Sequence, residues 1–196
     1  MKFYTSDQHF DHANIIKFCK RPWATVEEMN DALVTKWNRR VSHSDDVYVL
    51  GDICFNKNRF IHFMKYLNGT KHIILGNHDP KNIQHELRGM KNVVLHDKVH
   101  VIKDNGRKIH LQHEPCFEWT GYWNGVVHFH GHTHGTIGKN YQRNAFDVGV
   151  DCRDYEPKTY DEIVGNDFVK FTIADGHTLI PRPDDMVVVD GKLEKK

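Results

Sequence analysis

The sequence predicts a layered α/β sandwich, in which two β-sheets pack together and helices lie outside them. Three observations support this prediction. Five apolar, strand-like runs are each followed by a short polar block, the first half of the chain alternates strand and helix patterns, and the second half is mostly strand. This order of elements is typical of two packed sheets flanked by helices.

Three segments have the pattern of helices, at about residues 25–40, 57–67 and 81–88. In the first segment, Thr25 and Glu28 have the spacing of a capping box. Met29, Leu33 and Trp37 then recur on one face, as in an amphipathic helix that is buried on one side.

Strand patterns cover residues 2–5, 47–50, 72–75, 93–95, 98–103, 107–112 and 126–130. Asn105-Gly106 separates two of these runs and is a strong signal for a hairpin turn. We predict one domain over residues 1–167. Residues 168–196 are predicted to be a C-terminal extension that packs on this domain and frays at its end.

Composition excludes several classes of protein. With 27 Lys+Arg against 26 Asp+Glu and a net charge of +1, the chain lacks the basic stripe of a dedicated duplex-DNA binder. Neither a signal peptide nor an apolar stretch of transmembrane length is recognisable, so we expect a cytoplasmic protein with no membrane partner. The four cysteines form no C-x-x-C pair, which favours free thiols over a zinc knuckle or a redox motif. No feature of the sequence predicts the oligomeric state.

The polar blocks contain residue types that bind metals. In chain order they are Asp7-Gln8-His9, Gly51-Asp52, Gly76-Asn77-His78-Asp79, His113 and Gly131-His132-Thr133-His134. Ligands of open α/β sheets bind beyond the carboxyl ends of the strands, so we expect these blocks to converge on one site. Their oxygen and imidazole donors suit Mn, Zn, Fe, Co or Ni.

Seven side chains of these blocks are candidate ligands: Asp7, His9, Asp52, Asn77, His113, His132 and His134. Seven ligands are too many for one tetrahedral ion but suit two ions that share a carboxylate. Two ions about 3.5–4 Å apart are a common device for phosphoester hydrolysis, because they activate water and neutralise phosphate oxygens.

The ordered blocks resemble the calcineurin-like metallophosphoesterase superfamily, whose pattern is D-x-H, G-D, G-N-H-[DE], H and G-H-x-H. The resemblance implies a four-layer αββα sandwich of two mixed β-sheets flanked by helices. It also implies two metal sites that share Asp52 as a bridge. One would be held by Asp7, His9, Asp52 and His134, and the other by Asp52, Asn77, His113 and His132. His78 would be the acid that protonates the leaving oxygen, and Asp79 would orient it.

A closer resemblance, over about residues 3–165, is to a small bacterial and phage branch of that superfamily. The matching segments are Asp7-Gln8-His9-Phe10-Asp11-His12, Asn14-Ile15-Ile16, Arg21-Pro22-Trp23 and Val148-Gly149-Val150-Asp151 with the later Pro157. Within them, Arg21 and His12 are candidate substrate-binding residues. The alternatives are a solvated loop arginine for Arg21 and surface packing for His12.

Other aromatic residues near the blocks have several interpretations. His128 and His130 are interpreted as buried histidines bonded to the backbone rather than as metal ligands. Trp119, Tyr122 and Trp123 are consistent with stacking on a nucleobase, with a place in the core or with a dimer contact, and the sequence leaves these three interpretations open.

The predicted function is that of a dinuclear metal-dependent phosphoesterase, with a phosphodiesterase acting on a small nucleotide or other diester favoured. The expected cofactors are two divalent ions, manganese first, with Fe, Zn, Ni or Co as alternatives. Phosphoprotein phosphatases carry an arginine in a G-D-x-x-x-R pattern, and none follows Asp52 here. The alternative functions are a nuclease on single-stranded nucleic acid, which the net charge does not favour, and an inactive binding scaffold of the same fold.

Overall fold

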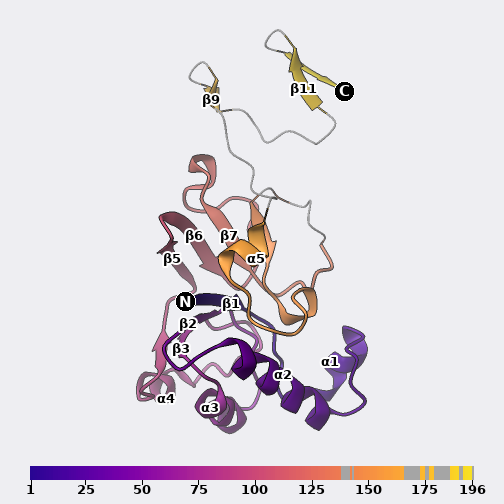
Figure 1. Cartoon of the computed structure of the whole chain (residues 1–196), viewed down its shortest axis with the longest axis vertical. Helices are drawn as coiled ribbons and strands as arrows, with labels where there is room; N and C mark the ends of the chain where they lie inside the picture. The colour runs from indigo at the N-terminus through magenta and orange to yellow at the C-terminus, as the bar shows by residue number, and fades with distance from the viewer. Residues whose placement is uncertain are drawn as a thin grey trace.

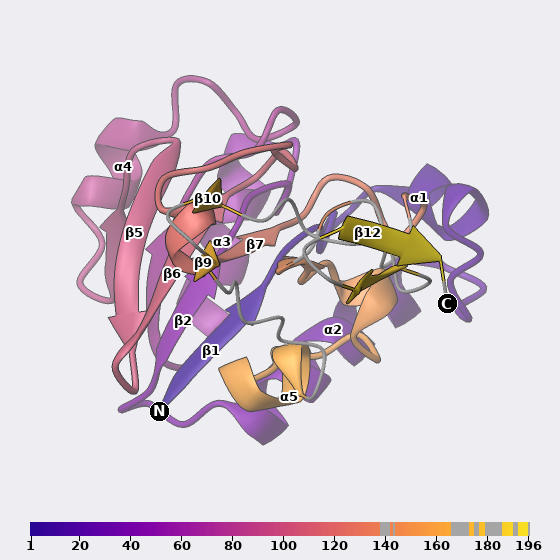
Figure 2. The same cartoon turned by 90° about the horizontal axis from the view of Figure 1, so that it is seen from above.

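The computed structural model describes residues 1–137, 142 and 144–165, together with the backbone of four short strands at 173–174, 177–178, 186–189 and 192–195. The predicted α/β fold is confirmed. Two four-stranded sheets pack against each other, and helices cover the outer face of the first (Figure 1). Seen from above in Figure 2, the second sheet lies over β1 and β2.

The first sheet is parallel throughout, which corrects the implied pair of mixed sheets. It comprises β1 (Lys2–Thr5), β2 (Asp46–Val49), β3 (Thr70–Ile73) and β4 (Val93–Leu95), in that spatial order. Successive side chains of a strand point to opposite faces. Phe3 and Val47 therefore pack beneath the helices, whereas Tyr4 and Tyr48 face the second sheet. All four carboxyl ends consequently lie along one edge of this sheet.

Four helices follow the strands of the first sheet and lie below it in Figure 1. They are α1 (Ala13–Phe18), α2 (Val26–Arg40), α3 (Lys57–Tyr66) and α4 (Gln84–Arg88). The predicted capping box is present, because Thr25 and Glu28 each accept from the other's backbone amide. Helices α2 and α3 confirm two predictions, α4 is shorter than predicted, and α1 was not predicted.

The second sheet is mixed. It comprises β5 (Val99–Asp104), β6 (Arg107–Gln112), β7 (Val127–His130) and β8 (Ala145–Asp147), in that spatial order. Only β5 and β6 are antiparallel. Asn105 and Gly106 join them with φ angles of 47° and 80°, which a two-residue hairpin of the predicted kind requires. The two sheets share a core that includes Tyr4, Leu111 and Phe129.

The outer face of the second sheet is covered by the segment after His113. Trp119 and Tyr122 are 6% and 4% exposed and pack on Val126 and Ala145, so these two aromatic residues belong to the core. The short 3-10 helix η1 (Tyr122–Asn124) lies in this segment. A second 3-10 helix, η2 (Val150–Cys152), and helix α5 (Tyr160–Val164) complete the domain, and α5 packs into the core between the sheets.

Three histidines stack where the two sheets meet at β3 and β5. The Nδ1 atom of His72 lies 3.0 Å from Nε2 of His96, and Nε2 of His72 lies 3.1 Å from a carboxylate oxygen of Asp46. The rings of His96 and His100 stack with 3.9 Å between centroids. Burial, followed by the neighbouring imidazoles, lowers the pKa of His96 to about 4. His96 is therefore neutral near neutral pH, between its hydrogen bond to His72 and its stacking on His100.

The extension beyond the domain contains two antiparallel strand pairs. They are β9 (Ile173–Ala174) with β10 (His177–Thr178), and β11 (Met186–Val189) with β12 (Lys192–Lys195). Residues 166–172, 175–176, 179–185, 190–191 and 196 lie outside the described residues. The domain boundary and the packing of the extension therefore stay predictions. Among the helices that the structure describes, none has the length and hydropathy needed to cross a bilayer.

Candidate metal centre

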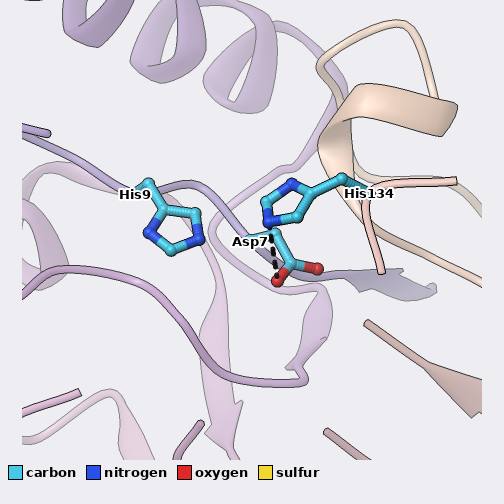
Figure 3. Close-up of side chains that lie close together, drawn as sticks. All are labelled: Asp7, His9 and His134. Atoms are coloured by element: carbon cyan, nitrogen blue, oxygen red, sulfur yellow. Dashed lines mark ion pairs between the residues drawn. The ribbon is translucent and has the colours of Figure 1, made fainter. Parts of the chain in front are cut away.

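The loops that follow β1, β2, β3, β6 and β7 meet at one edge of the molecule and carry the predicted ligands. Six of these side chains form two groups within ligand distance. Asp7, His9 and His134 form the first group, and Asp52, His113 and His132 form the second. Figure 3 shows the first group, in which a dashed line joins the imidazole of His134 to the Asp7 carboxylate and the ring of His9 lies beside that of His134. Nε2 of His134 lies 4.0 Å from Oδ1 of Asp7.

Asp52 belongs to the second group and also lies close to the first. Its Oδ2 atom is 3.7 Å from Nε2 of His9 and 3.3 Å from Nε2 of His113. Asn77 completes the second group, because its Oδ1 is 2.9 Å from Nε2 of His113 and 2.9 Å from Nδ1 of His132. A single carboxylate oxygen between two clusters of donors is the geometry that a bridging ligand needs.

Two of the imidazoles use Nδ1 to bond an oxygen outside the ligand set and direct Nε2 toward the site. Nδ1 of His113 lies 2.6 Å from the carbonyl oxygen of Leu50, which only accepts, so Nδ1 carries the proton. Nδ1 of His134 donates in the same way to Oδ2 of Asp151, at 2.7 Å. A metal ion in the site would therefore meet Nε2 of both side chains.

The site has the features expected of a cation site. Asp7, His9, Asp52 and His113 are each at most 2% exposed. Among the described residues, neither ring nitrogen of His9 has a hydrogen-bond partner, although both are buried. Burial raises the pKa of Asp7 to about 7 and lowers that of His9 to about 3. Buried nitrogen atoms without a partner, such as those of His9, are costly unless a cation binds them, so the residues present fit divalent ions.

The backbone of the ligand loops is strained. Five of the seven predicted ligands have positive φ: Asp7 at 61°, His9 at 51°, Asp52 at 54°, His132 at 71° and His134 at 48°. Such a left-handed conformation costs a non-glycine residue about 1–2 kcal/mol. Strain of this kind concentrates at functional sites, where the surrounding structure holds it in place.

Two glycines allow the loops to approach the carboxylates. A Cβ atom at Gly131 would collide with the side chains of Ser6 and Asp7, and one at Gly76 would collide with Asp52. Gly131 and Gly76 are therefore required by the close approach of their backbone to a neighbouring loop.

Asp79 has partners other than the predicted one. Its Oδ2 accepts from the amides of Asp52 and Gly76, both at 2.9 Å, and its Oδ1 accepts from Ile53 at 2.7 Å and from Cys54 at 3.2 Å. These contacts do not support the prediction that Asp79 orients His78. Instead, the buried carboxylate joins the loop after β2 to the loop after β3.

Arg21 is buried rather than open to a substrate, which corrects the predicted role. Its guanidinium donates to both oxygens of Asp151 at 2.8 Å, and to the carbonyl oxygens of Gln8 at 2.8 Å and Asp7 at 2.7 Å. The side chain is 0% exposed. Arg21 therefore fixes Asp151, which in turn holds His134. Cys19 also lies within ligand distance of His134 and Asp151.

His78 and His12 border the site. The His78 side chain is exposed, and its backbone amide donates to Oδ1 of Asp52 at 2.9 Å. Its ring lies 5.6 Å from that of His9 between centroids. The ring of His12 is also 5.6 Å from that of His9, on the loop that enters α1. Both predicted residues therefore lie close enough to the ligands to contact a bound substrate.

Comparison with known proteins places the chain in a family. An uncharacterized protein of the archaeon Methanocaldococcus jannaschii is 36% identical over 170 residues, which cover 83% of this chain and 88% of that protein. The chain belongs to the family of this archaeal protein. The gene 66 protein of Mycobacterium phage L5 is 28% identical over 179 residues, covering 76% of this chain and 86% of the phage protein. No protein-family model matches the chain.

Solved structures support the fold of this family member. The crystal structure of a protein of unknown function from Aquifex aeolicus aligns with a TM-score of 0.66 at 25% identity, covering 83% of this chain and 96% of that one. An archaeal phosphodiesterase aligns with a TM-score of 0.45 at 17% identity, over 76% of this chain and 81% of that one. The second likeness is too low to support any assignment.

Two acidic residues of this family member support the site, although neither is among the predicted site residues. Asp151 was part of a matched segment, and its partner Arg21 is 130 positions away in the chain. Asp147 ends β8 and holds the loop after β7, because its carboxylate accepts from Thr133 at 2.7 Å and from the amide of Gly135 at 2.9 Å. The sequence signal that could have indicated these two residues is an aspartate after a short apolar run. It occurs twice, because Asp147 follows Ala145-Phe146 and Asp151 follows Val148-Gly149-Val150.

Proposed function

We propose that this protein is a dinuclear metal-dependent phosphoester hydrolase and that its preferred substrate is a phosphodiester. The observation that supports the proposal most strongly is Oδ2 of Asp52, which lies 3.7 Å from Nε2 of His9 and 3.3 Å from Nε2 of His113. Two divalent ions in this site would supply hydroxide near neutral pH and neutralise phosphate oxygens. The order of the blocks, which resembles that of the calcineurin-like metallophosphoesterases, supports the same class.

The side chains have distinct tasks in this proposal. Asp7, His9, Asp52 and His134 hold one ion, and Asp52, Asn77, His113 and His132 hold the other. His78 donates a proton to the leaving oxygen, which its exposed side chain can reach beside His9. Asp79 and Asp151 bind no substrate but fix the loops and the ring of His134. Manganese is the expected metal, since oxygen and imidazole donors predominate.

The test is metal-stimulated hydrolysis of bis(p-nitrophenyl) phosphate. Chelated protein should be inactive and should regain activity when Mn²⁺ is added, with two ions bound per chain by elemental analysis. The Asp52→Asn variant is the matched control, because it keeps the size of the side chain and removes the shared charge. We expect it to lose activity by orders of magnitude while its circular dichroism is unchanged. Two bound ions without hydrolysis of any phosphoester would favour the inactive scaffold instead.

A further inference from the structure

Two large aromatic side chains are exposed beside the candidate metal centre. Phe55 is 45% exposed and Phe18 is 73% exposed. The ring centroid of Phe55 lies 4.8 Å from that of His78, 4.8 Å from that of His12 and 5.9 Å from that of His9. Phe18 lies on the other side of His12, with 6.3 Å between ring centroids. The rings of Phe55, His12 and Phe18 therefore form an aromatic wall beside the site, next to the proposed acid His78.

The backbone on both sides of Phe55 is anchored, so its ring has no route into the core. Ile53 and Cys54 are buried, and their amides donate to Asp79. Cys54 also pairs with Phe10 in a parallel bridge. On the other side, the Asn56 side chain caps α3 by accepting from the amides of Asn58 and Arg59. The exposure of Phe55 is consequently a fixed feature of the loop.

The orientation of these rings suits a planar partner. The Phe55 ring stands at 84° to that of His12 and at 62° to that of His78, so it meets both imidazoles in edge contacts. Aromatic rings prefer such edge-to-face and offset-stacked arrangements with further rings. Nδ1 of His12 is buried and has no hydrogen-bond partner among the described residues. The ring of His12 thus contacts both phenylalanines.

We propose that Phe55, Phe18 and His12 form a subsite for a planar aromatic group on the leaving side of the phosphoester, as a nucleobase would provide. This inference rests on the proposed function, because it assigns the leaving side from the position of His78. Phe55 supplies the stacking surface, and Phe18 extends it. Stacking of a base on an aromatic side chain is worth roughly 5- to 150-fold in affinity.

The experiment compares two phosphate ligands that differ only in the base. Calorimetric titration of the manganese-loaded protein should give a dissociation constant for adenosine 5′-monophosphate at least fivefold below that for ribose 5-phosphate. Phe55→Ala should remove most of this difference and leave ribose 5-phosphate binding unchanged, whereas Phe55→Tyr should keep the difference. Tyr66→Ala is the matched control, since Tyr66 is 59% exposed on α3, outside the wall.

Each other outcome has a definite meaning. Equal affinities for the two ligands, in a protein that hydrolyses bis(p-nitrophenyl) phosphate, would overturn the subsite and leave the proposed function standing. A protein that binds neither ligand and hydrolyses no diester would instead overturn the proposed function. Tight binding of hexyl phosphate, with full affinity retained by Phe55→Leu, would show that the wall selects an alkyl chain and would overturn the aromatic assignment.

Discussion

At the scale of single residues, the site depends on how each imidazole is held. His113 and His134 each use Nδ1 for a carbonyl or carboxylate and leave Nε2 for the centre. His78 differs, because it is exposed and only its backbone is bonded to Asp52. The first two histidines are therefore suited to hold a cation, and the third is suited to exchange protons with a substrate.

The role of His78 predicts a dependence on the leaving group. His78→Ala should keep both metal ions and lose roughly 10²–10⁴-fold in rate on esters with alkoxide leaving groups, because these need a proton. The loss on p-nitrophenyl esters should be much smaller, since p-nitrophenolate leaves without one. The measurement is kcat/KM on both ester types, with metal content determined in parallel. Equal losses on both would show that His78 binds the phosphate or the attacking water.

Asp151 should control metal affinity without touching the metal. Asp151→Asn keeps an acceptor for His134 but removes the charge that orients it and that pairs with buried Arg21. Mutation of such a partner typically weakens metal binding by roughly 10–100-fold. Competition with a chelator of known affinity measures the change. Asp154→Asn is the control and should bind metal normally, because the Asp154 side chain is 81% exposed and pairs with Lys158. Unchanged affinity in Asp151→Asn would rule out this positioning role.

At the scale of elements, the sequence predicted those features that depend on residues close together in the chain. The capping box of α2 and the Asn105-Gly106 hairpin are encoded within a few residues, and both are present. Strand β8 has only three residues, so pairing with β7 rather than sequence pattern defines it. Helix α5 carries a capping box at Thr159 and Glu162. This signal is present in the sequence, but the helix of five residues is too short to show a recognisable apolar periodicity.

The candidate site was predictable in its members but only partly in their roles. The order of the blocks predicted which side chains come together, because parallel strands deliver their carboxyl ends to one edge. Partners over long sequence separations were not predictable. The long side chain of Arg21 could reach a substrate or Asp151, and only the packed structure distinguishes these. In the same way, nothing local assigns Asp79 to the three backbone amides of the loop after β2.

The histidine stack between β3 and β5 predicts acid sensitivity. The pKa of His96 in the folded protein, about 4, lies below the ordinary value of 6.5, and that of His100 is also lowered by burial. The unfolded chain therefore binds more protons in this range, so stability is full above about pH 6.5 and falls as the pH drops towards 4. Urea denaturation from pH 7 to 4 should show this decline, and His96→Gln should flatten it. An identical slope in the variant would assign the decline to other groups.

At the scale of the whole molecule, the centre joins the two sheets. Asp7, Asp52 and Asn77 follow strands of the first sheet, whereas His113, His132 and His134 follow strands of the second. Ions that bind both sets would connect the sheets at one edge, in addition to the apolar core between them.

Removal of metal should therefore lower thermal stability. A ligand present at 100 times its dissociation constant stabilises the folded state by about 2.7 kcal/mol. For a chain of this size that corresponds to roughly 5–10 °C in Tm for each ion. Differential scanning fluorimetry with and without chelator measures the shift, and Asp52→Asn should show little of it. A Tm that is independent of metal in the wild-type protein would contradict the proposed connection between the sheets.

The separation of Asp7 and His9 from His134 along the chain has a consequence for biosynthesis. A ribosome must translate beyond His134, and beyond Asp151 for full support, before the first ligand group can close. At usual elongation rates this leaves Asp7 and His9 as an incomplete chelate for roughly ten seconds. In the proposed site, binding of that ion would therefore be a late event in maturation, because a nascent chain that ends before His134 holds only three of the four ligands, Asp7, His9 and Asp52.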